Sequence, residues 1–295
     1  MKTVKLKGAD IQVPSGDAFA YQTPPEMPKC HGVFVAVARR GGGKSVAISN
    51  LVRMMSYDRV FLVSPTAKSN RAILEPLGIA ENDVFEDVDD PNVIQKVIDE
   101  INTERDDYEQ YHRAMKEYKK FLSYLNKDDV TKIPDDLLIS FYRGGQFEPP
   151  SHRWGGRKPK LALIVDDCQN SKVFTSKTLP AMVVKGRHYG QLKKGGAIGV
   201  SVFLMCQNFK CVGGGLPKSI RGNSTGWLLF KNYNDKEKMA VAEELAFSED
   251  KEQFITAWDD VCDSEPHAFM FVDMNKKTEH LSPYRKNFNE FLILQ

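Results

Sequence analysis

One stretch, from Val33 to Ser45, limits what this chain can fold into more than any other. Its first part, Val33–Ala38, is apolar and rich in β-branched residues, which is typical of a buried strand. Three consecutive glycines follow, and then a segment from Ser45 to Met55 whose apolar residues recur at helical spacing. A strand, a glycine loop and a helix in this order predict an α/β fold with a mostly parallel central sheet flanked by helices.

The glycine loop and the residues beside it have the side-chain types that bind the phosphates of a nucleotide. Glycines let backbone N–H groups converge on phosphate oxygens, a lysine reaches the terminal phosphates, and a serine hydroxyl ligates Mg²⁺. The N-terminus of the following helix adds partial positive charge. The usual pattern has glycine six positions before the lysine, where this chain has Ala38. We expect a nucleoside triphosphate to bind here, and a glycine-rich turn with a surface lysine is the alternative; the residues concerned are Arg40, Gly41, Gly42, Gly43, Lys44 and Ser45.

A second buried strand, Leu161–Val165, leads directly into paired carboxylates, Asp166 and Asp167. Because parallel strands present their carboxyl ends at one edge of a sheet, we expect these acids at the mouth of the glycine loop. There Asp166 would hold Mg²⁺ through its water shell, and Asp167 would orient or deprotonate an attacking water. A strand that ends in two acids is common by chance, and the pairing with the glycine loop gives this one its weight.

Three further polar residues follow the same logic. The apolar run Val200–Asn208 ends in Gln207, which can sense a γ-phosphate or position water, or can simply cap its strand. Arg221 precedes the strand Trp227–Phe230, and Arg187 precedes the Val200–Asn208 strand. Either arginine suits a finger that stabilises transition-state charge, in cis or from a neighbouring subunit, and an ordinary surface arginine is the alternative.

Asn92 to Leu125 carries apolar residues at a period near 3.5 with charged residues between them, which predicts a long amphipathic helix or a helical hairpin. We treat 92–145 as a helical insertion. It either packs on its own domain or forms an arm that contacts a neighbouring subunit or partner, and the pattern leaves both open.

The remaining segments complete one domain. A 295-residue chain can hold a single large α/β domain, which we place at 31–295 after an N-terminal arm at 1–30. A buried strand is expected at Arg59–Thr66 and a short strand around Phe19–Tyr21. The tail predicts helices at Asp235–Phe247 and Glu249–Val261, then a strand at Ala268–Val272.

Cysteines and apolar runs bear on the environment of the chain. Its five cysteines are odd in number and form no CxxC pair, so we expect free thiols in a reducing compartment. The first residues are too polar for a signal peptide, and no run reaches the ~18 apolar residues of a membrane span.

Charge is distributed unevenly along the chain. From Ser151 to Arg221 there are thirteen basic and two acidic residues, a net +11, whereas the remainder carries a net −9. Such a block, called the basic block below, indicates an anionic partner. The alternative is a solvated surface balanced by neighbouring acids.

Taken in order, these motifs resemble the viral DNA-packaging ATPases of the HerA–FtsK superfamily, of the poxvirus, giant-virus and virophage type. The resemblance covers roughly residues 30 to 235. Its more telling pieces are Arg187-His188-Tyr189 and Leu216-Pro217-x-x-Ile220-Arg221-x-Asn223, which generic phosphate-loop proteins lack. Many relatives carry Glu at the position of Asp167, although poxvirus-type members share the Asp-Asp pair.

The resemblance implies a P-loop NTPase fold of the ASCE, RecA-like class. It implies ATP phosphates on Lys44 and Ser45, Mg²⁺ on Ser45 and Asp166, a catalytic carboxylate at Asp167 and a sensor at Gln207. It also implies an arginine finger, Arg221 or Arg187, acting across the interfaces of a homo-oligomeric ring.

The partners implied are double-stranded DNA, gripped through its phosphates without regard to sequence, and capsid or vertex proteins. The location implied is the host cytoplasm or viral assembly site, or association with the virion. Other interpretations stay open: a cellular or plasmid-transfer DNA pump of the same superfamily, a nucleotide kinase, or an ATP-binding assembly module that hydrolyses little.

Overall fold

The computed structural model describes residues 23–125, 133–144, 148–169, 171–210, 215–247 and 249–294. Within this part of the chain, nine strands form one sheet in the order β3-β2-β4-β5-β1-β6-β7-β8-β9. The pairs from β3 to β6 are parallel, and those from β6 to β9 are antiparallel. The strand bounds are β1 Val33–Val37, β2 Arg59–Val63, β3 Val84–Phe85, β4 Leu161–Asp166, β5 Ser201–Cys206, β6 Gly226–Leu229, β7 Met270–Asp273, β8 Tyr284–Lys286 and β9 Glu290–Leu292.

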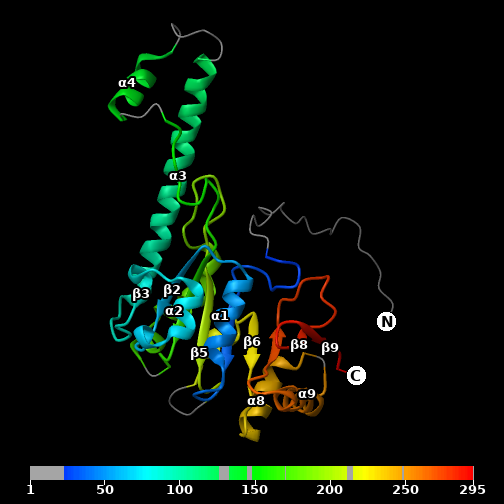
Figure 1. Cartoon of the computed structure of the whole chain (residues 1–295). Coiled ribbons are helices and arrows are strands. Elements are labelled where there is room, and N and C mark those ends of the chain that lie inside the picture. Colours follow the sequence, from blue (N-terminus) through cyan, green and yellow to red (C-terminus); the bar gives the residue numbers. More distant parts are fainter. Residues whose placement is uncertain are drawn as a thin grey trace, which may run out of the picture.

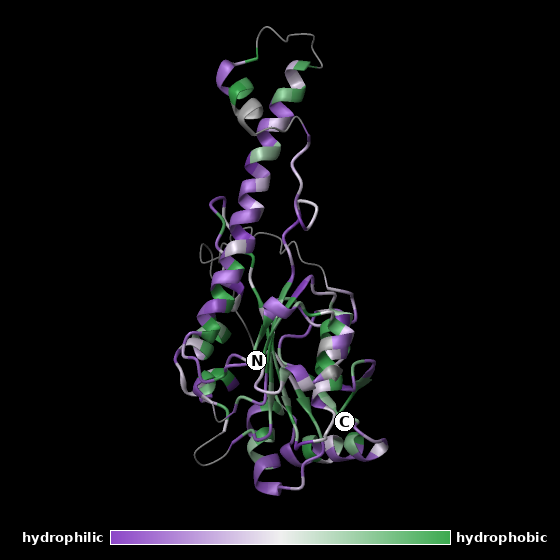
Figure 2. Ribbon diagram, turned by 60° about the vertical axis from the view of Figure 1, so that its left-hand side comes forward, coloured by the Kyte–Doolittle hydropathy of each residue, from purple (hydrophilic) through white to green (hydrophobic). Residues whose placement is uncertain are grey.

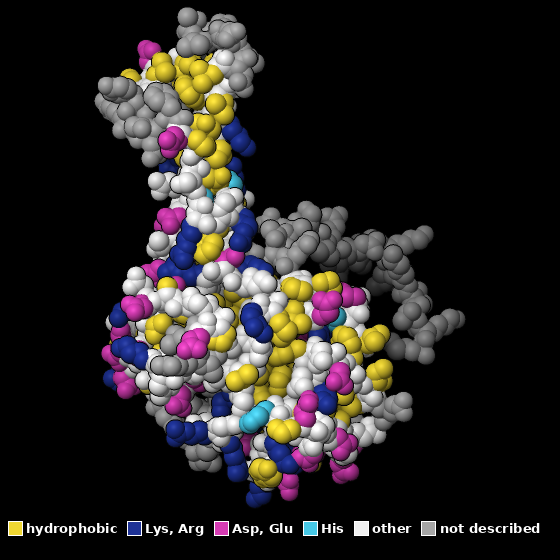
Figure 3. All heavy atoms as spheres, viewed as in Figure 1, with side chains coloured by type: hydrophobic (Ala, Val, Ile, Leu, Met, Phe, Trp, Pro, Cys, Tyr) yellow, Lys and Arg dark blue, Asp and Glu magenta, His cyan; other side chains and the backbone are white. Residues whose placement is uncertain are grey.

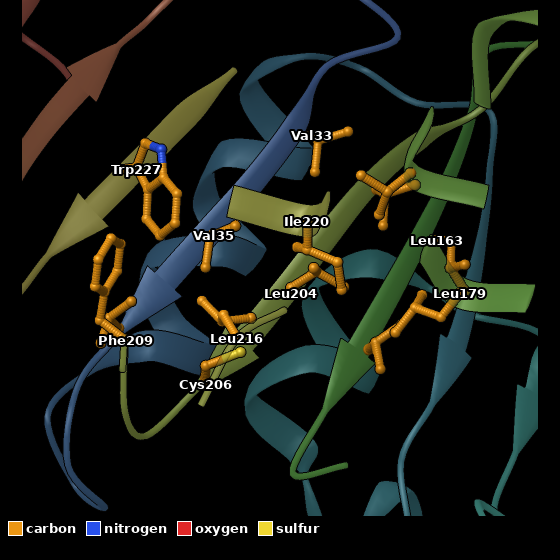
Figure 4. Close-up of a cluster of buried hydrophobic side chains, with 14 of the residues drawn as sticks. Val33, Val35, Leu163, Leu179, Leu204, Cys206, Phe209, Leu216, Ile220 and Trp227 are labelled. Carbon is orange, nitrogen blue, oxygen red and sulfur yellow. The ribbon is translucent and has the colours of Figure 1, made fainter. Parts of the chain in front are cut away.

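Helices cover both faces of this sheet (Figure 1). Apolar side chains of α1 and α2 belong to the cluster on one face, while those of α3 and α5 to α9 belong to the cluster on the other. Figure 4 shows the second face, where Ile220 lies among side chains of β1, β5 and β6 such as Val35, Leu204 and Trp227. The helices are α1 Lys44–Met54, α2 Arg71–Leu77, α3 Val93–Leu125, α4 Asp135–Gly144, α5 Lys172–Thr175, α6 Thr178–Lys185, α7 Lys218–Arg221, α8 Asp235–Leu245 and α9 Lys251–Ser264.

The strand predictions are confirmed for β1, β2, β4, β5, β6 and β7, each within three residues of the expected bounds. Both tail helices are present as α8 and α9. The central strands are buried at every position on both faces, which is why their sequences are continuous apolar runs (Figure 2). The short strand expected around Phe19–Tyr21 lies outside the described residues.

The segment 92–125 is a single helix, α3, and not a hairpin. Its first turns bury Val93, Val97 and Ile101 against the sheet, and its remainder extends away from the body with α4 near its far end (Figure 1). Apolar side chains are exposed in that region, among them Leu125 and Ile139 (Figure 3). The helix is therefore a packed core helix over its first turns and an arm beyond them.

A buried ionic cluster fastens α3 to the sheet at the point where it leaves the body. Arg59, on β2, donates to Asp83 at 2.6 Å, to Glu100 at 2.7 Å and to Glu104 at 3.0 Å. The indole of Trp154 donates to the second oxygen of Glu104 at 2.6 Å. A helix, a strand and the returning chain are thus joined by one set of charge-assisted hydrogen bonds.

Four cysteines, Cys30, Cys168, Cys206 and Cys262, are free thiols, and Cys211 lies outside the described residues. Burial raises the pKa of the Cys168 thiol to about 12. Within the described ranges, no helix is both long enough and apolar enough to span a membrane.

Candidate nucleotide-binding site

The glycine loop lies at the carboxyl end of β1 and begins α1. The N–H of Ala38 donates to the carbonyl of Cys206 at 3.1 Å, which ties the start of the loop to the end of β5. Gly41 and Gly43 have φ values of 76° and 96°, in the left-handed region that favours glycine. Helix α1 then starts without a side-chain cap and without an acidic residue in its first turn. Its first N–H groups are therefore available to an anion.

Ala38, which stands where the usual pattern has glycine, fits because of Gly42. A Cβ added at Gly42 would lie only 2.8 Å from the Cβ of Ala38 and 3.1 Å from the carbonyl oxygen of Arg39. The space between positions 38 and 42 therefore holds one methyl group but not two. In this chain the methyl group belongs to Ala38, and position 42 is glycine.

Lys44 lies over this loop, with its ammonium directed at backbone oxygens. Its Nζ donates to the carbonyls of Ala38 at 2.6 Å and of Arg39 at 3.1 Å. Burial lowers the pKa of Lys44, and the nearby carboxylates of Asp166 and Asp167 act in the opposite direction. An anion placed at the loop would exchange the two carbonyl contacts for a full charge partner.

The first carboxylate of the pair ends β4 and is almost fully buried. Asp166 is 7% exposed and accepts a hydrogen bond of 2.9 Å from Nδ2 of Asn70, which follows β2. Burial raises the pKa of Asp166, the Asn70 hydrogen bond and Lys44 lower it, and Asp167 raises it. The carboxylate of Asp166 also accepts a hydrogen bond from the backbone N–H of Asp167, which lowers its pKa.

Asp167 leaves the strand in a left-handed conformation, with a φ of 52°. Asp and Asn adopt this region more readily than longer side chains, which explains an aspartate here in physical terms. Its Oδ1 accepts a hydrogen bond of 3.3 Å from Nε2 of Gln207, at the end of β5. The structure therefore brings together Lys44, Asp166, Asp167 and Gln207, which the sequence predicts at one edge of the sheet.

Two residues of this edge were not expected from the sequence. Asn70 holds Asp166, and Gln169 accepts hydrogen bonds from the backbone N–H of Gln207 at 2.8 Å and of Asn208 at 3.3 Å. Gln169 also donates to the carbonyl of Asn208 at 2.8 Å, so it joins the ends of β4 and β5. Both are polar residues within a few positions of a strand end, the only signal that could have suggested them.

A magnesium ion fits the oxygen atoms available. The hydroxyl of Ser45 makes no hydrogen bond to another described residue, and the carboxylate of Asp166 has a second oxygen beside the one that Asn70 contacts. In the described chain, no group of three or more His, Cys, Asp or Glu side chains could hold a metal. Mg²⁺ commonly binds through one or two protein oxygens and takes its other ligands from phosphates and water, which matches this donor set.

Arg221 is held within its own subunit. Its side chain is 13% exposed, donates to Glu244 at 3.0 Å and lies 5.4 Å over the ring of Phe209. It also donates to the carbonyl of Leu216. Arg187 differs, because its exposed side chain donates to His188, at 3.0 Å, and to no other described residue. Arg187 lies with Val33 and Thr225 beside one cavity, at the edge where β1 and β6 begin, opposite to the glycine loop.

Part of the basic block is neutralised by acids from elsewhere in the chain. Arg157 pairs with Asp58 at 2.5 Å, Lys193 with Glu109 at 3.6 Å, and Lys210 with Glu244 at 2.8 Å. Other members are exposed and make no ion pair with a described residue, namely Lys172, Lys177, Lys185, Arg187, Lys194 and Lys218.

The chain is similar in structure to viral DNA-packaging ATPases. One is the DNA-packaging ATPase B204 from Sulfolobus turreted icosahedral virus, at 12% identity and a TM-score of 0.45 over 88% of this chain and 97% of that one. Another is the genome-packaging NTPase B204 from Sulfolobus turreted icosahedral virus 2 in complex with ATP-gammaS, also at 12% identity and a TM-score of 0.45, over 87% of this chain and 96% of that one. No protein-family model matches the sequence. No curated protein matches it either.

Proposed function

We propose that this chain is a Mg²⁺-dependent ATPase that drives double-stranded DNA into a viral capsid. The observation that carries the proposal is the meeting of four elements at one sheet edge: the glycine loop after β1, Lys44, the Asp166–Asp167 pair after β4, and Gln207 after β5. Strand β5 lies between β1 and β4. That order supports the ASCE, RecA-like class of P-loop NTPases, with 92–145 as an insertion into its core.

In the proposed reaction, the first N–H groups of α1 and the ammonium of Lys44 bind the phosphates. Bound Mg²⁺, held by Ser45 and by Asp166, would neutralise charge that develops on the phosphate oxygens. Asp167 orients the attacking water or takes a proton from it. Gln207 positions Asp167, and through it the water, by its hydrogen bond to the carboxylate of Asp167. An arginine of a neighbouring subunit in a ring completes the site, which can be worth roughly 10³–10⁵ in rate.

Of the two candidate fingers, Arg187 is better suited to act on a neighbour. Its guanidinium is exposed, whereas Arg221 is bound to Glu244 and Leu216 within its own subunit. Withdrawing Arg221 would leave the carboxylate of Glu244 with Lys210 as its remaining cation among the described residues. We therefore assign the finger to Arg187 and a positioning role to Arg221.

The exposed cations of the basic block supply the contacts to DNA. Lysine and arginine contacts to phosphates are indifferent to sequence and release counterions, so binding weakens steeply as salt rises. The substrate, duplex DNA, and the capsid or vertex partner follow from the resemblance of the motifs to viral packaging ATPases.

The test is ATP hydrolysis by the purified protein with and without long duplex DNA, at two salt concentrations, beside the Lys44→Ala variant. We expect hydrolysis that DNA stimulates, that salt weakens and that the variant lacks. Hydrolysis that is unchanged by DNA would remove the translocase and leave a nucleotide-binding assembly module. Equal hydrolysis by wild type and Lys44→Ala would place the activity outside this site.

A further inference from the structure

A cavity of about 630 Å³ opens directly beside the glycine loop. One wall is the loop and one side of α1, from Lys44 to its last residue, Met54. The other wall comes from the far end of the sequence and includes His267, Phe269 and Phe288. Its volume lies within the roughly 300–1,000 Å³ of small-molecule sites.

Two apolar side chains in this cavity stand out. Val46, the third residue of α1, is 55% exposed although it directly follows Lys44 and Ser45. Phe288 is half-buried and makes edge contacts with Phe269 and Phe271, at centroid distances of 4.9 and 5.6 Å. An aromatic ring held by its neighbours, in a cavity that also exposes a valine, suits a flat apolar ligand.

The wall that carries Phe288 is fixed by hydrogen bonds. Asn287, with a φ of 51°, donates to Glu265 at 2.9 Å and accepts from the N–H of Phe269 at 3.3 Å. The buried Arg285 donates to the carbonyl of Phe288 at 3.2 Å. Because this turn between β8 and β9 is already ordered, a ligand that binds against it does not have to order it.

One polar side chain of this wall is uncommitted. The amide of Asn289 is exposed and makes no hydrogen bond to another described residue, whereas the amide of Asn287 is used on both its oxygen and its nitrogen. A side-chain amide offers a donor and an acceptor together, which is what the edge of a purine base presents in complementary form.

We propose that this cavity is the nucleoside subsite of the glycine loop, with a purine base against Phe288 and its edge read by Asn289. The proposal rests on the proposed function, because it takes the phosphates to be bound by Lys44 and the start of α1. With the phosphates in that position, the sugar and base would extend from the start of α1 past Val46, and Val46 lines this cavity. The C-terminal hairpin would then make nucleotide binding depend on residues about 240 positions from the loop.

A second cavity, of about 540 Å³, adjoins the other side of the loop and provides the comparison. Its exposed aromatic residue is Tyr233, which lies 5.6 Å from the guanidinium of Arg39. No residue of α1 lines this cavity, so it does not adjoin the N–H groups that would hold the phosphate nearest the sugar.

Calorimetric titration of ATP and of inorganic tripolyphosphate, both with Mg²⁺, separates base from phosphate binding. We expect Phe288→Ala to weaken ATP binding by roughly 5- to 150-fold, the range seen when one base–aromatic stack is removed. Tripolyphosphate binding should not change, which also shows that the variant is folded. Tyr233→Ala, the matched aromatic variant, should bind both as the wild type does. Asn289→Ala should narrow the preference for ATP over GTP or over a pyrimidine nucleotide.

The outcomes are distinguishable. If wild type binds neither ATP nor tripolyphosphate, the proposed function fails. If it binds both but Phe288→Ala retains full ATP affinity, or Tyr233→Ala alone loses it, the nucleoside subsite is wrong and the proposed function stands. If Phe288→Ala loses tripolyphosphate as well, Asn289→Ala decides, since an exposed asparagine can be replaced without loss of fold. Unchanged nucleotide preference in that variant would overturn the subsite.

Discussion

Asn70 holds Asp166 by a hydrogen bond of 2.9 Å from its side-chain amide to Oδ2. The two residues are 96 positions apart and come from neighbouring strands, since Asn70 follows β2 and Asp166 ends β4. This contact fixes the orientation of the carboxylate that we propose for Mg²⁺. It also stabilises the charged form of a group whose burial favours the neutral form.

Removal of this hydrogen bond should move the pH dependence of hydrolysis. Burial already raises the pKa of Asp166, so the carboxylate becomes protonated at a higher pH than an ordinary aspartate as the solution is acidified. Asn70→Ala deletes an interaction that lowers this pKa, so the pKa should rise further. The acidic limb of the kcat/KM profile should therefore shift to higher pH. The kcat/KM profiles of the wild type and of Asn70→Ala would be measured against pH at saturating and at limiting Mg²⁺. Acidic limbs that coincide would contradict the assignment of Asp166 as the Mg²⁺-binding carboxylate.

The Asp167→Asn variant should bind ATP normally and hydrolyse it poorly. Asparagine adopts the left-handed backbone of this position as readily as aspartate does, so the fold should be preserved. Loss of the proton acceptor should lower kcat by roughly 10²–10⁴. Asp167→Glu should also be impaired, because the longer side chain is less suited to a φ of 52° and would displace Gln207. Single-turnover hydrolysis and ATP affinity would be measured together, and full activity of the Glu variant would refute the backbone argument.

The central strands could be predicted from the sequence because each is a continuous apolar run that is followed by polar or charged residues. Strand β3, with two residues, and the β8–β9 hairpin carry no such run, since they are edge elements whose pairing is set by the sheet they join. The period of 92–125 predicts an amphipathic helical segment but does not distinguish one long helix from a hairpin. Helix α3 packs on the sheet at its start and extends into solvent beyond it. The point at which its burial stops cannot be read from a hydrophobic pattern that repeats along the whole helix.

Within the candidate site, Lys44, Asp166, Asp167 and Gln207 could be predicted because parallel strands deliver their carboxyl ends to one edge. The partners of these residues could not. Asn70 follows a short 3-10 helix after β2, and its distance from Asp166 is a result of tertiary packing. The pairing of Arg221 with Glu244 has the same origin, and an arginine that looked free in the sequence is thereby engaged.

Arg221→Ala should mainly lower stability, whereas Arg187→Ala should mainly lower DNA-stimulated ATP hydrolysis. Loss of Arg221 removes charge-assisted contacts to Glu244 and Leu216, so it should lower the free energy of unfolding by about 1.5–3 kcal/mol. Loss of the exposed Arg187 should change stability by no more than about 0.5 kcal/mol and abolish DNA-stimulated hydrolysis. Urea unfolding and ATPase assays decide, with Glu244→Gln as the control that weakens the Arg221 pair from its other side. A stable Arg221→Ala protein without ATPase activity would return the finger to Arg221.

The glycine loop should accept a methyl group at Gly42 in place of the one at Ala38 only in part. Gly42→Ala places two Cβ atoms 2.8 Å apart, so the loop must shift and ATP affinity should fall. The double variant Ala38→Gly/Gly42→Ala removes that contact and should recover part of the loss, since the 3.1 Å approach to the Arg39 carbonyl remains. Ala38→Gly alone is the reference. Equal affinity of the single Gly42→Ala variant and the double variant would show that the Ala38 contact does not limit the loop.

The ionic cluster at the base of the arm should contribute strongly to the stability of the fold. Arg59 is 10% exposed in its side chain, and its partners Asp83 and Glu104 are each 5% exposed. Arg59→Met keeps the apolar stem of the side chain but removes its guanidinium. It leaves the buried Asp83 without its cation and Glu104 with only the exposed Arg153, at 3.7 Å, so it should lower the free energy of unfolding by about 3–5 kcal/mol. The control is Arg105→Met on α3, whose pairing with Asp106 is largely exposed and should be worth less than about 1 kcal/mol.

Chemical denaturation of both variants, with ATP affinity as a second readout, tests the role of the cluster. Equal destabilisation by Arg59→Met and Arg105→Met would refute that role. Because the cluster lies at β2 and α3 rather than at the glycine loop, ATP affinity of the Arg59→Met protein that remains folded should equal that of the wild type.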